Sequence, residues 1–106
     1  MGFDQYHEPP EELSEQARTM ARVMMSLIEE AEAINWYNQR LEVEKDSEAE
    51  EIMRQAQKEE FLHFGMDLEY LLRRMPTWKT VLENILFQEG NLVKLGEKAE
   101  KAALGH

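Results

Sequence analysis

The chain has 106 residues, no cysteine, 22 Asp and Glu against 12 Lys and Arg, and a formal net charge of -10. This length allows one small domain, and the lack of cysteine excludes disulfide scaffolds, thiolate zinc sites and cysteine nucleophiles. The negative charge disfavours nucleic acid as a partner, and no apolar run approaches the length of a membrane span. We therefore expect an acidic helical chain that binds neither nucleic acid nor membranes and for which cations are better partners than anions. The lack of cysteine agrees with a reducing compartment.

The N-terminal part predicts an extended segment followed by one long helix. Residues 1–10 are polar and end in Pro9-Pro10, which is typical of an extended lead-in. Over residues 11–43 there is no Gly or Pro, and apolar side chains recur at steps of three and four residues. That spacing predicts an amphipathic helix.

A charged break at residues 44–46 precedes a second periodic stretch. Ser47 and Glu50 have the spacing of a capping box, in which each side chain accepts a hydrogen bond from a backbone amide of the first turn. The apolar pattern continues to Met75, and Pro76 ends it. The pattern predicts a second long helix, antiparallel to the first.

The C-terminal part predicts a third, shorter helix and a tail. Thr77 is placed to cap this helix, and Gly90 ends it. From Gly96 on, the composition predicts either disorder or a solvated helix. Two roles stay open for the apolar stretch 92–96, which are docking on a partner and packing back on the chain.

The predicted fold class is all-α, a two-helix antiparallel hairpin plus a short C-terminal helix. Residues 11–90 form a single domain between the extended segment 1–10 and the tail 91–106. Two helices do not close a core, because each leaves an apolar side uncovered. Since four helices are the common closed arrangement, we expect two chains to dimerise into a four-helix bundle.

The strongest chemical signal is the Glu-x-x-His spacing of Glu60 and His63, which places both side chains on one helix face, where they can hold one ion. Taken alone, this spacing also describes an exposed Glu beside a core or capped histidine. Glu30 lies as far before the turn near residue 45 as Glu60 lies after it, about 22 Å at about 1.5 Å per residue. The two carboxylates should therefore face each other.

Glu30 belongs to the apolar stripe, between Leu27 and Ile34, where a carboxylate is costly unless a cation or a proton compensates it. Ferritin-like di-iron bundles take one Glu from each of two helices and a Glu-x-x-His from each of the other two. Half of this set is present, so a two-fold dimer would complete a site from Glu30, Glu60 and His63 of both chains. Such ligands suit two iron ions, with Mn, Zn or Ca as substitutes.

The chain resembles the encapsulated ferritins over roughly residues 7–90. Several motifs agree in order, namely His7–Pro9, Glu29–Tyr37, Glu59–His63, Met66–Arg74 and Leu86–Gly90. The resemblance implies a hairpin that dimerises into a ferritin-like four-helix bundle and assembles into a ring of five dimers. It also implies oxidation of Fe(II) by oxygen inside a cytoplasmic encapsulin shell, which stores the mineral.

The resemblance implies a role for each matching acidic position. Glu30, Glu60 and His63 match the ferroxidase ligands, which makes them the catalytic and metal-binding residues. Glu29 and Glu32 match acidic residues that attract metal to the centre, although both could simply face water.

Trp36 and Tyr37 match aromatic residues beside the centre. Packing is the expected role of Trp36, whereas for Tyr37 two roles stay open, holding a ligand carboxylate in place and plain packing. This sequence differs from the family at Leu62 and Gln55, where members carry an acidic residue and a histidine. It has Asn35 where an Asp is frequent.

Three functions follow from these patterns. The leading hypothesis is an iron oxidase, and the alternatives are a metal-binding sensor or chaperone without turnover and a metal-free structural oligomer. Oxygen consumption on adding Fe(II) separates the first from the second. A melting temperature that does not change on adding Fe(II) or Zn(II) would indicate the metal-free structural oligomer, because a ligand that binds the folded state must raise the melting temperature.

Overall fold

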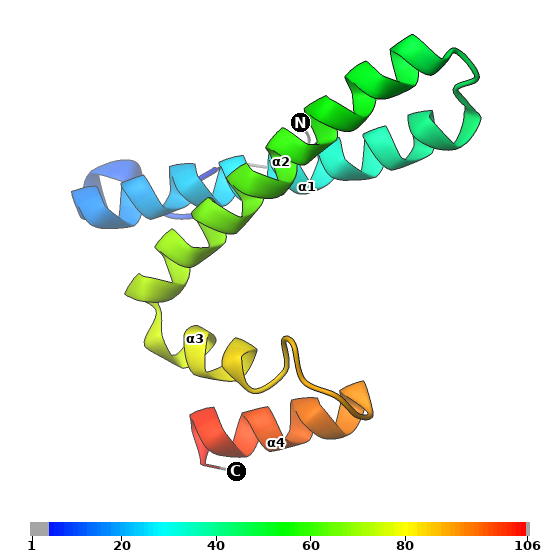
Figure 1. The fold of residues 1–106 in the computed structure, drawn as a ribbon. Helices are drawn as coiled ribbons and strands as arrows, with labels where there is room; N and C mark the ends of the chain where they lie inside the picture. The colour runs from blue at the N-terminus through cyan, green and yellow to red at the C-terminus, as the bar shows by residue number, and fades with distance from the viewer. Residues whose placement is uncertain (1–4, 106) are drawn as a thin grey trace. The chain divides into compact units, whose positions relative to one another are not determined.

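The computed structural model describes residues 5–105, and within them every regular element is a helix. Residues 1–4 of the predicted extended segment and His106 of the predicted tail lie outside the described residues. The elements in chain order (Figure 1) are the 3-10 helix η1 (Pro10–Glu12) and the α-helices α1 (Glu15–Val43), α2 (Ser47–Arg74), α3 (Pro76–Glu83) and α4 (Leu92–Leu104). The predicted all-α fold class is confirmed. No described helix is long and apolar enough to cross a membrane.

The chain divides into two compact units, one up to Glu69 and the other from Tyr70 on. The first unit is the hairpin of α1 and α2, which run antiparallel and side by side away from a turn at residues 44–46 (Figure 1). The second unit holds the last turn of α2 together with α3 and α4. The predicted domain boundaries at residues 10 and 90 remain predictions.

Helix α1 begins later than the apolar pattern alone indicates. The Ser14 hydroxyl accepts a hydrogen bond from the Ala17 backbone amide at 3.0 Å, which caps the helix so that its first residue is Glu15. The preceding residues Pro10–Glu12 form the 3-10 turn. The helix ends at Val43, as predicted.

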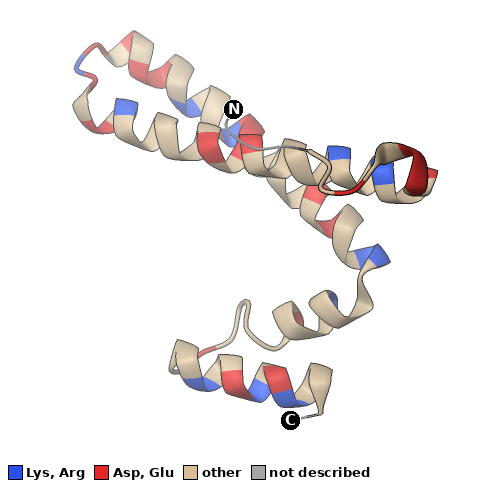
Figure 2. Ribbon diagram, turned by 180° about the vertical axis from the view of Figure 1, so that it is seen from behind, with Lys and Arg blue, Asp and Glu red and all other residues tan. Residues whose placement is uncertain are grey.

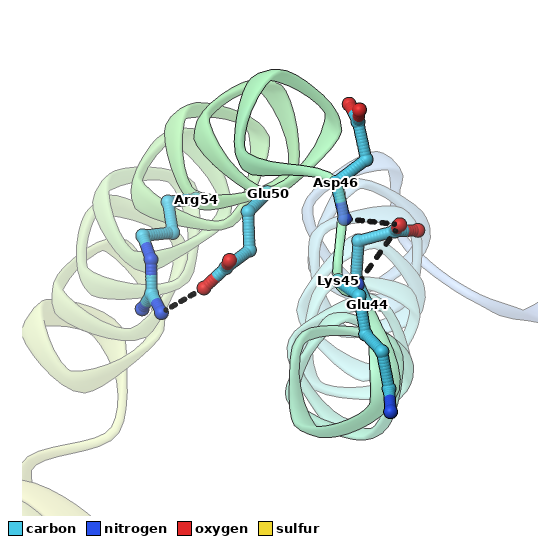
Figure 3. A network of polar contacts seen from close by, with 5 residues as sticks. All are labelled: Glu44, Lys45, Asp46, Glu50 and Arg54. Atoms are coloured by element: carbon cyan, nitrogen blue, oxygen red, sulfur yellow. Dashed lines mark hydrogen bonds and ion pairs between the residues drawn. The ribbon is translucent and has the colours of Figure 1, made fainter.

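An aspartate, rather than the predicted serine, caps α2. Asp46 Oδ2 accepts a hydrogen bond from the Ala49 amide at 2.9 Å. Glu50 forms an ion pair with Arg54 at 2.8 Å (Figure 3). The capping box predicted for Ser47 and Glu50 was therefore wrong. The carboxylate of Asp46 is a stronger acceptor than a hydroxyl, and Asp46 is the residue directly before the helix, which is the capping position.

A buried glutamine sets the register between the two long helices. Gln57 is 8% exposed and is the one buried polar side chain among residues 5–105. Its Nε2 group donates to the Ile34 carbonyl at 3.1 Å and to Asn38 Oδ1 at 2.9 Å. Because a buried amide without partners is costly, these two bonds favour one alignment of α2 against α1. Sequence analysis did not identify this residue.

The hairpin does not enclose a core of its own. No residue of α1 is fully buried, and on α2 the side chains of Ile52, Leu62 and Met66 are each more than half exposed. Scattered exposed apolar residues are normal, but several on one long helix mark a surface that can bind another protein. This agrees with the expectation that two helices leave apolar sides uncovered.

In the second unit, α3 packs on α4, and the buried residues are Leu71, Leu72 and Ala99. Pro76 occupies the first turn of α3, where its missing amide hydrogen costs nothing, and no side chain caps the helix. The predicted cap by Thr77 was therefore wrong.

Helix α3 ends at Glu83, before the predicted stop at Gly90, which has a positive φ of 118° in the following loop. Asn91 then caps α4 by accepting a hydrogen bond from the Lys94 amide at 3.0 Å. Of the two states predicted for the tail, the helix is the one observed. It packs through Ala99 instead of being solvated all round.

Candidate metal centre

Two potential ligands share one face of α2. Glu60 and His63 are one helical turn apart, and Glu60 Oε1 lies 3.4 Å from His63 Nδ1. Glu60 is half-buried against the hairpin, whereas His63 is exposed. The helix therefore presents a carboxylate and an imidazole side by side, as the Glu-x-x-His spacing predicted.

Helix α1 adds a third potential ligand at the same point. One ligand atom from each of Glu30, Glu60 and His63 lies within 4.8 Å of the others. This places Glu30 opposite Glu60, at the level predicted from their equal distances to the turn. A divalent cation could contact all three side chains with small rotamer changes.

Electrostatics at this point disfavour the charged form of Glu30. The pKa of Glu30 is raised from 4.5 to about 7, mainly because burial removes water from the carboxylate. The neighbouring Asp67 carboxylate raises this pKa further, because protonated Glu30 can donate a hydrogen bond to it and ionised Glu30 is repelled by it, and repulsion by Glu60 adds a smaller amount. Only His63 acts in the opposite direction. A cation would reverse this balance by favouring the ionised carboxylate.

Two carboxylate oxygens at the centre lack a hydrogen-bond donor. Glu30 Oε1 and Asp67 Oδ2 are buried, and neither receives a hydrogen bond from a protein donor in the part of the chain that the structure describes. Since both groups are acceptors when ionised, they can satisfy each other only by sharing a proton. An unpaired buried carboxylate oxygen is what a metal ion would satisfy, and carboxylates with imidazole suit Fe, Mn and Zn. The residues present therefore fit a metal.

Asp67 was missed as a member of this centre. Sequence analysis noted it only inside the motif Met66–Arg74. Its position was informative, because Asp67 follows His63 by four residues and Glu60 by seven, which places all three on one face of a helix. A search for acidic residues at these spacings would have identified it.

The remaining predicted residues do not join the three-ligand group. Glu29 is exposed and Glu32 is half-buried on α1, where Asp and Glu occur along both hairpin helices (Figure 2). Trp36 is exposed and lies beside a shallow pocket that it lines with Gln39 and Arg40. These positions leave metal attraction by Glu29 and Glu32 as a prediction.

Tyr37 is half-buried, and the Arg40 guanidinium lies over its ring, 5.3 Å from the ring centre. Among the described residues its hydroxyl makes no hydrogen bond to a ligand carboxylate. Within one chain, this favours plain packing over the ligand-holding role.

A helical hairpin that brings two carboxylates and one imidazole to one point, with apolar surface left uncovered, defines a class of protein. Its two carboxylates and one imidazole match half of the donor set of the carboxylate-bridged metal sites that four-helix bundles build. One chain supplies too few donors for two ions.

Comparison with known proteins identifies the family. A sequence model of the EncFtn-like family matches residues 5–89, and the chain belongs to this family. It is 40% identical over 95 residues to the "Ferritin-like protein" of Thermotoga maritima, and the aligned region covers 90% of this chain and 83% of that protein. It is also 37% identical over 99 residues to the "Encapsulated ferritin-like protein" of Rhodospirillum rubrum, covering 93% and 70% respectively.

A solved structure confirms the fold. Protein ne0167 from Nitrosomonas europaea is similar with a TM-score of 0.79 and 39% identity, covering 84% of this chain and 99% of that one. The resemblance to encapsulated ferritins is thus confirmed, and family membership supports a ferritin-like, iron-related role.

Proposed function

We propose that this chain is the subunit of a ferroxidase, which oxidises Fe(II) to Fe(III) with oxygen at a di-iron site formed between two copies. The observation that carries this proposal is the convergence of Glu30, Glu60 and His63 within 4.8 Å, beside a buried carboxylate oxygen that has no donor. Two carboxylates and one imidazole are half of the donor set that a two-iron helical bundle requires.

The residues of the centre have distinct roles in this proposal. Glu60 and His63 hold the substrate Fe(II) from one helix, and Glu30 closes the site from the other. When iron binds, the carboxyl of Glu30, whose pKa is near 7, gives up its proton, so that the cation replaces the proton as the compensating charge. Each of the two Fe(II) ions supplies one electron, and one oxygen molecule accepts both electrons together with two protons from water, which gives two Fe(III) and hydrogen peroxide.

Assembly with a second copy supports the same function. The exposed apolar residues of α2, which include Ile52, Leu62 and Met66, would be covered by a second hairpin. That hairpin would bring the same three ligands to the same point across a two-fold axis. Glu29 and Glu32, which are within one helical turn of Glu30 on α1, would attract Fe(II) to the dimeric site.

The larger assembly is proposed from the family. One relative is named an encapsulated ferritin-like protein, which favours work inside an encapsulin shell that stores the oxidised iron. We further propose the ring of five dimers and the cytoplasmic location that the resemblance implies.

The test is oxygen consumption by the purified chain after Fe(II) is added. We expect one oxygen molecule to be consumed for two Fe(II), at a rate well above that of buffer, and about one bound iron per chain. Glu60→Ala should lose this activity. Glu42→Ala, which removes an exposed acid of α1 outside the centre, should keep it.

Metal binding without oxygen consumption would contradict the proposal and favour a non-catalytic metal-binding protein. A melting temperature that does not change on adding Fe(II) or Zn(II) would instead indicate a structural helical oligomer.

A further inference from the structure

Gln57 ties the two long helices together at one point. Its Nε2 group donates two hydrogen bonds from α2 to α1, one to the Ile34 carbonyl at 3.1 Å and one to Asn38 Oδ1 at 2.9 Å. Both distances are those of well-formed N–H···O bonds. One acceptor belongs to the backbone of α1 and the other to a side chain, so the Gln57 amide is held by both.

Apolar packing leaves the alignment of this hairpin weakly specified. Within residues 5–69, which are the described part of the first unit, Gln57 is the one buried residue, and every apolar side chain is half-buried or exposed. Apolar contacts have no preferred direction, so they tolerate a small displacement of one helix along another. The hydrogen bonds of a buried amide do not, because they weaken steeply with angle and are costly to leave unmade. The alignment of α2 against α1 therefore depends on Gln57.

The two hydrogen bonds lie one helical turn from the candidate ligands. On α2, Gln57 precedes Glu60 by three residues, and on α1, Ile34 follows Glu30 by four. Because the helices are antiparallel, both steps lead from the ligands towards the same turn at residues 44–46. A displacement of α2 by the rise of one residue would move Glu60 by about 1.5 Å along α1. Metal–ligand distances vary by only about 0.2 Å, so such a displacement would separate the ligands of the two helices.

We infer that Gln57 is a positioning residue, whose hydrogen bonds to Asn38 and to the Ile34 carbonyl hold α2 in the alignment that brings Glu60 and His63 to Glu30. This inference rests on the proposed function only in so far as these three residues bind metal. It does not depend on whether the bound metal is oxidised.

The test measures metal binding by the full chain with two redox-stable probes, Zn(II) by calorimetry and Co(II) by visible absorption. Gln57→Leu keeps a side chain of similar size that favours helices, but it removes both hydrogen bonds. It should weaken Zn(II) binding by about 10-fold or more and change the Co(II) spectrum, because Glu60 and His63 are no longer held opposite Glu30. Gln39→Leu makes the same change at an exposed position, nine residues from Glu30 on the opposite face of α1, and should bind as the parent does.

A purely structural role of Gln57 would give a different result. Leucine at this position leaves no buried group without a partner, because Asn38 is exposed to water and the Ile34 carbonyl lies within α1, where the helix supplies a donor. The melting temperature and helical content without metal should therefore be kept. Loss of metal affinity at an unchanged melting temperature is the signature of positioning, whereas a lower melting temperature with parent-like affinity would assign a structural role alone.

Asn38→Ala tests the same contact from α1, at an exposed position where alanine favours the helix. It removes one of the two hydrogen bonds, so it should weaken Zn(II) binding by a smaller factor than Gln57→Leu. In the Gln57→Leu background it should weaken binding no further, because its partner is already gone. If Gln57→Leu does not fold, weaker binding by Asn38→Ala still supports the inference, and parent-like binding overturns it.

Two further results would overturn the inference. One is parent-like Zn(II) affinity with an unchanged Co(II) spectrum in folded Gln57→Leu. The other is an equal effect of Asn38→Ala in the parent and in the Gln57→Leu background, which would mean that the two side chains act independently. Failure of the parent itself to bind either metal would overturn the proposed centre together with this role. The other failures leave metal binding by the parent intact, so they are distinguishable from it.

Discussion

The two acidic regions of the hairpin differ in how their carboxylates are compensated. At the turn, Glu44 Oε2 accepts hydrogen bonds from the backbone amides of Lys45 and Asp46, both at 3.1 Å, and Glu50 pairs with Arg54 at 2.8 Å (Figure 3). At the centre of the hairpin, the acidic side chains meet mainly other acids. Glu30 Oε1 has no donor in the described residues, and its pKa rises to about 7.

This contrast teaches that acidic content alone does not indicate a metal site. Each carboxylate of the turn has a donor supplied by its own local backbone or helix, so it has no use for a cation. At the centre, Glu60 lies beside His63 of its own helix, but Glu30 on α1 and Asp67 on α2 each have a buried oxygen with no donor in the described residues. A carboxylate cluster thus becomes a candidate metal site when the fold places no hydrogen-bond donor within reach of its oxygens.

The largest expected effect comes from removing a ligand at the centre. Glu30→Ala should lower Fe(II) oxidation to near the uncatalysed rate and abolish paired metal occupancy, because a two-fold dimer loses two carboxylates at once. The fold should persist, since alanine favours helices and a poorly compensated charge is gone. Oxygen uptake, metal content and circular dichroism of the same sample check this. Parent-like oxidation by a folded dimer would contradict the assignment of the site.

Removal of metal should weaken the association of chains at the proposed interface around the centre and should not change the hydrogen bonds of the turn. Without a cation, the carboxylates of two chains repel each other at the proposed interface, and Fe(II) or Zn(II) should neutralise them. Native mass spectrometry should therefore show a shift towards larger assemblies on adding metal and a shift back on adding chelator. Identical distributions under both conditions would rule out this coupling.

A mutation of the helix cap at the turn should lower stability and leave iron oxidation unchanged, whereas a mutation at the centre should do the reverse. Asp46→Ala removes the acceptor for the Ala49 amide, which should lower the free energy of unfolding by about 1 kcal/mol. Iron oxidation per folded chain should not change. Thermal unfolding gives the first quantity and oxygen uptake the second. A large loss of oxidation in folded Asp46→Ala would mean that the turn contributes to the centre.

The smallest expected effect is a pH dependence of stability without metal. Because the pKa of Glu30 is raised from 4.5 to about 7, its contribution to stability is present below pH 4.5 and is lost as the pH rises through 7. Glu30→Gln has no such group. Its stability relative to the parent should therefore increase from pH 4.5 to pH 8, by on the order of 1 kcal/mol after allowance for partial exposure.

Denaturant unfolding of both proteins in chelator measures this difference. Glu29→Gln, on the exposed side of α1, is the control and should show no comparable trend. A constant difference between Glu30→Gln and the parent across this range would mean that Glu30 is not a site of proton binding in the folded state.

Sequence alone determined the hairpin and the meeting of Glu30 with Glu60 and His63. The helical period and the stops at Val43 and Pro76 are local features, and the rise per residue is fixed by helix geometry. For this reason a count from the turn was sufficient to place Glu30 opposite Glu60. Nothing in that argument required knowledge of side-chain packing.

Only the tertiary structure decided which polar groups find partners. The burial of Gln57 between the helices and the closeness of the Asp67 and Glu30 carboxyl groups each depend on rotamers and on how closely two backbones approach. A sequence pattern reports which face a residue occupies. It does not report whether a donor lies within hydrogen-bonding distance there, because that distance is set by the packing of segments far apart in the chain.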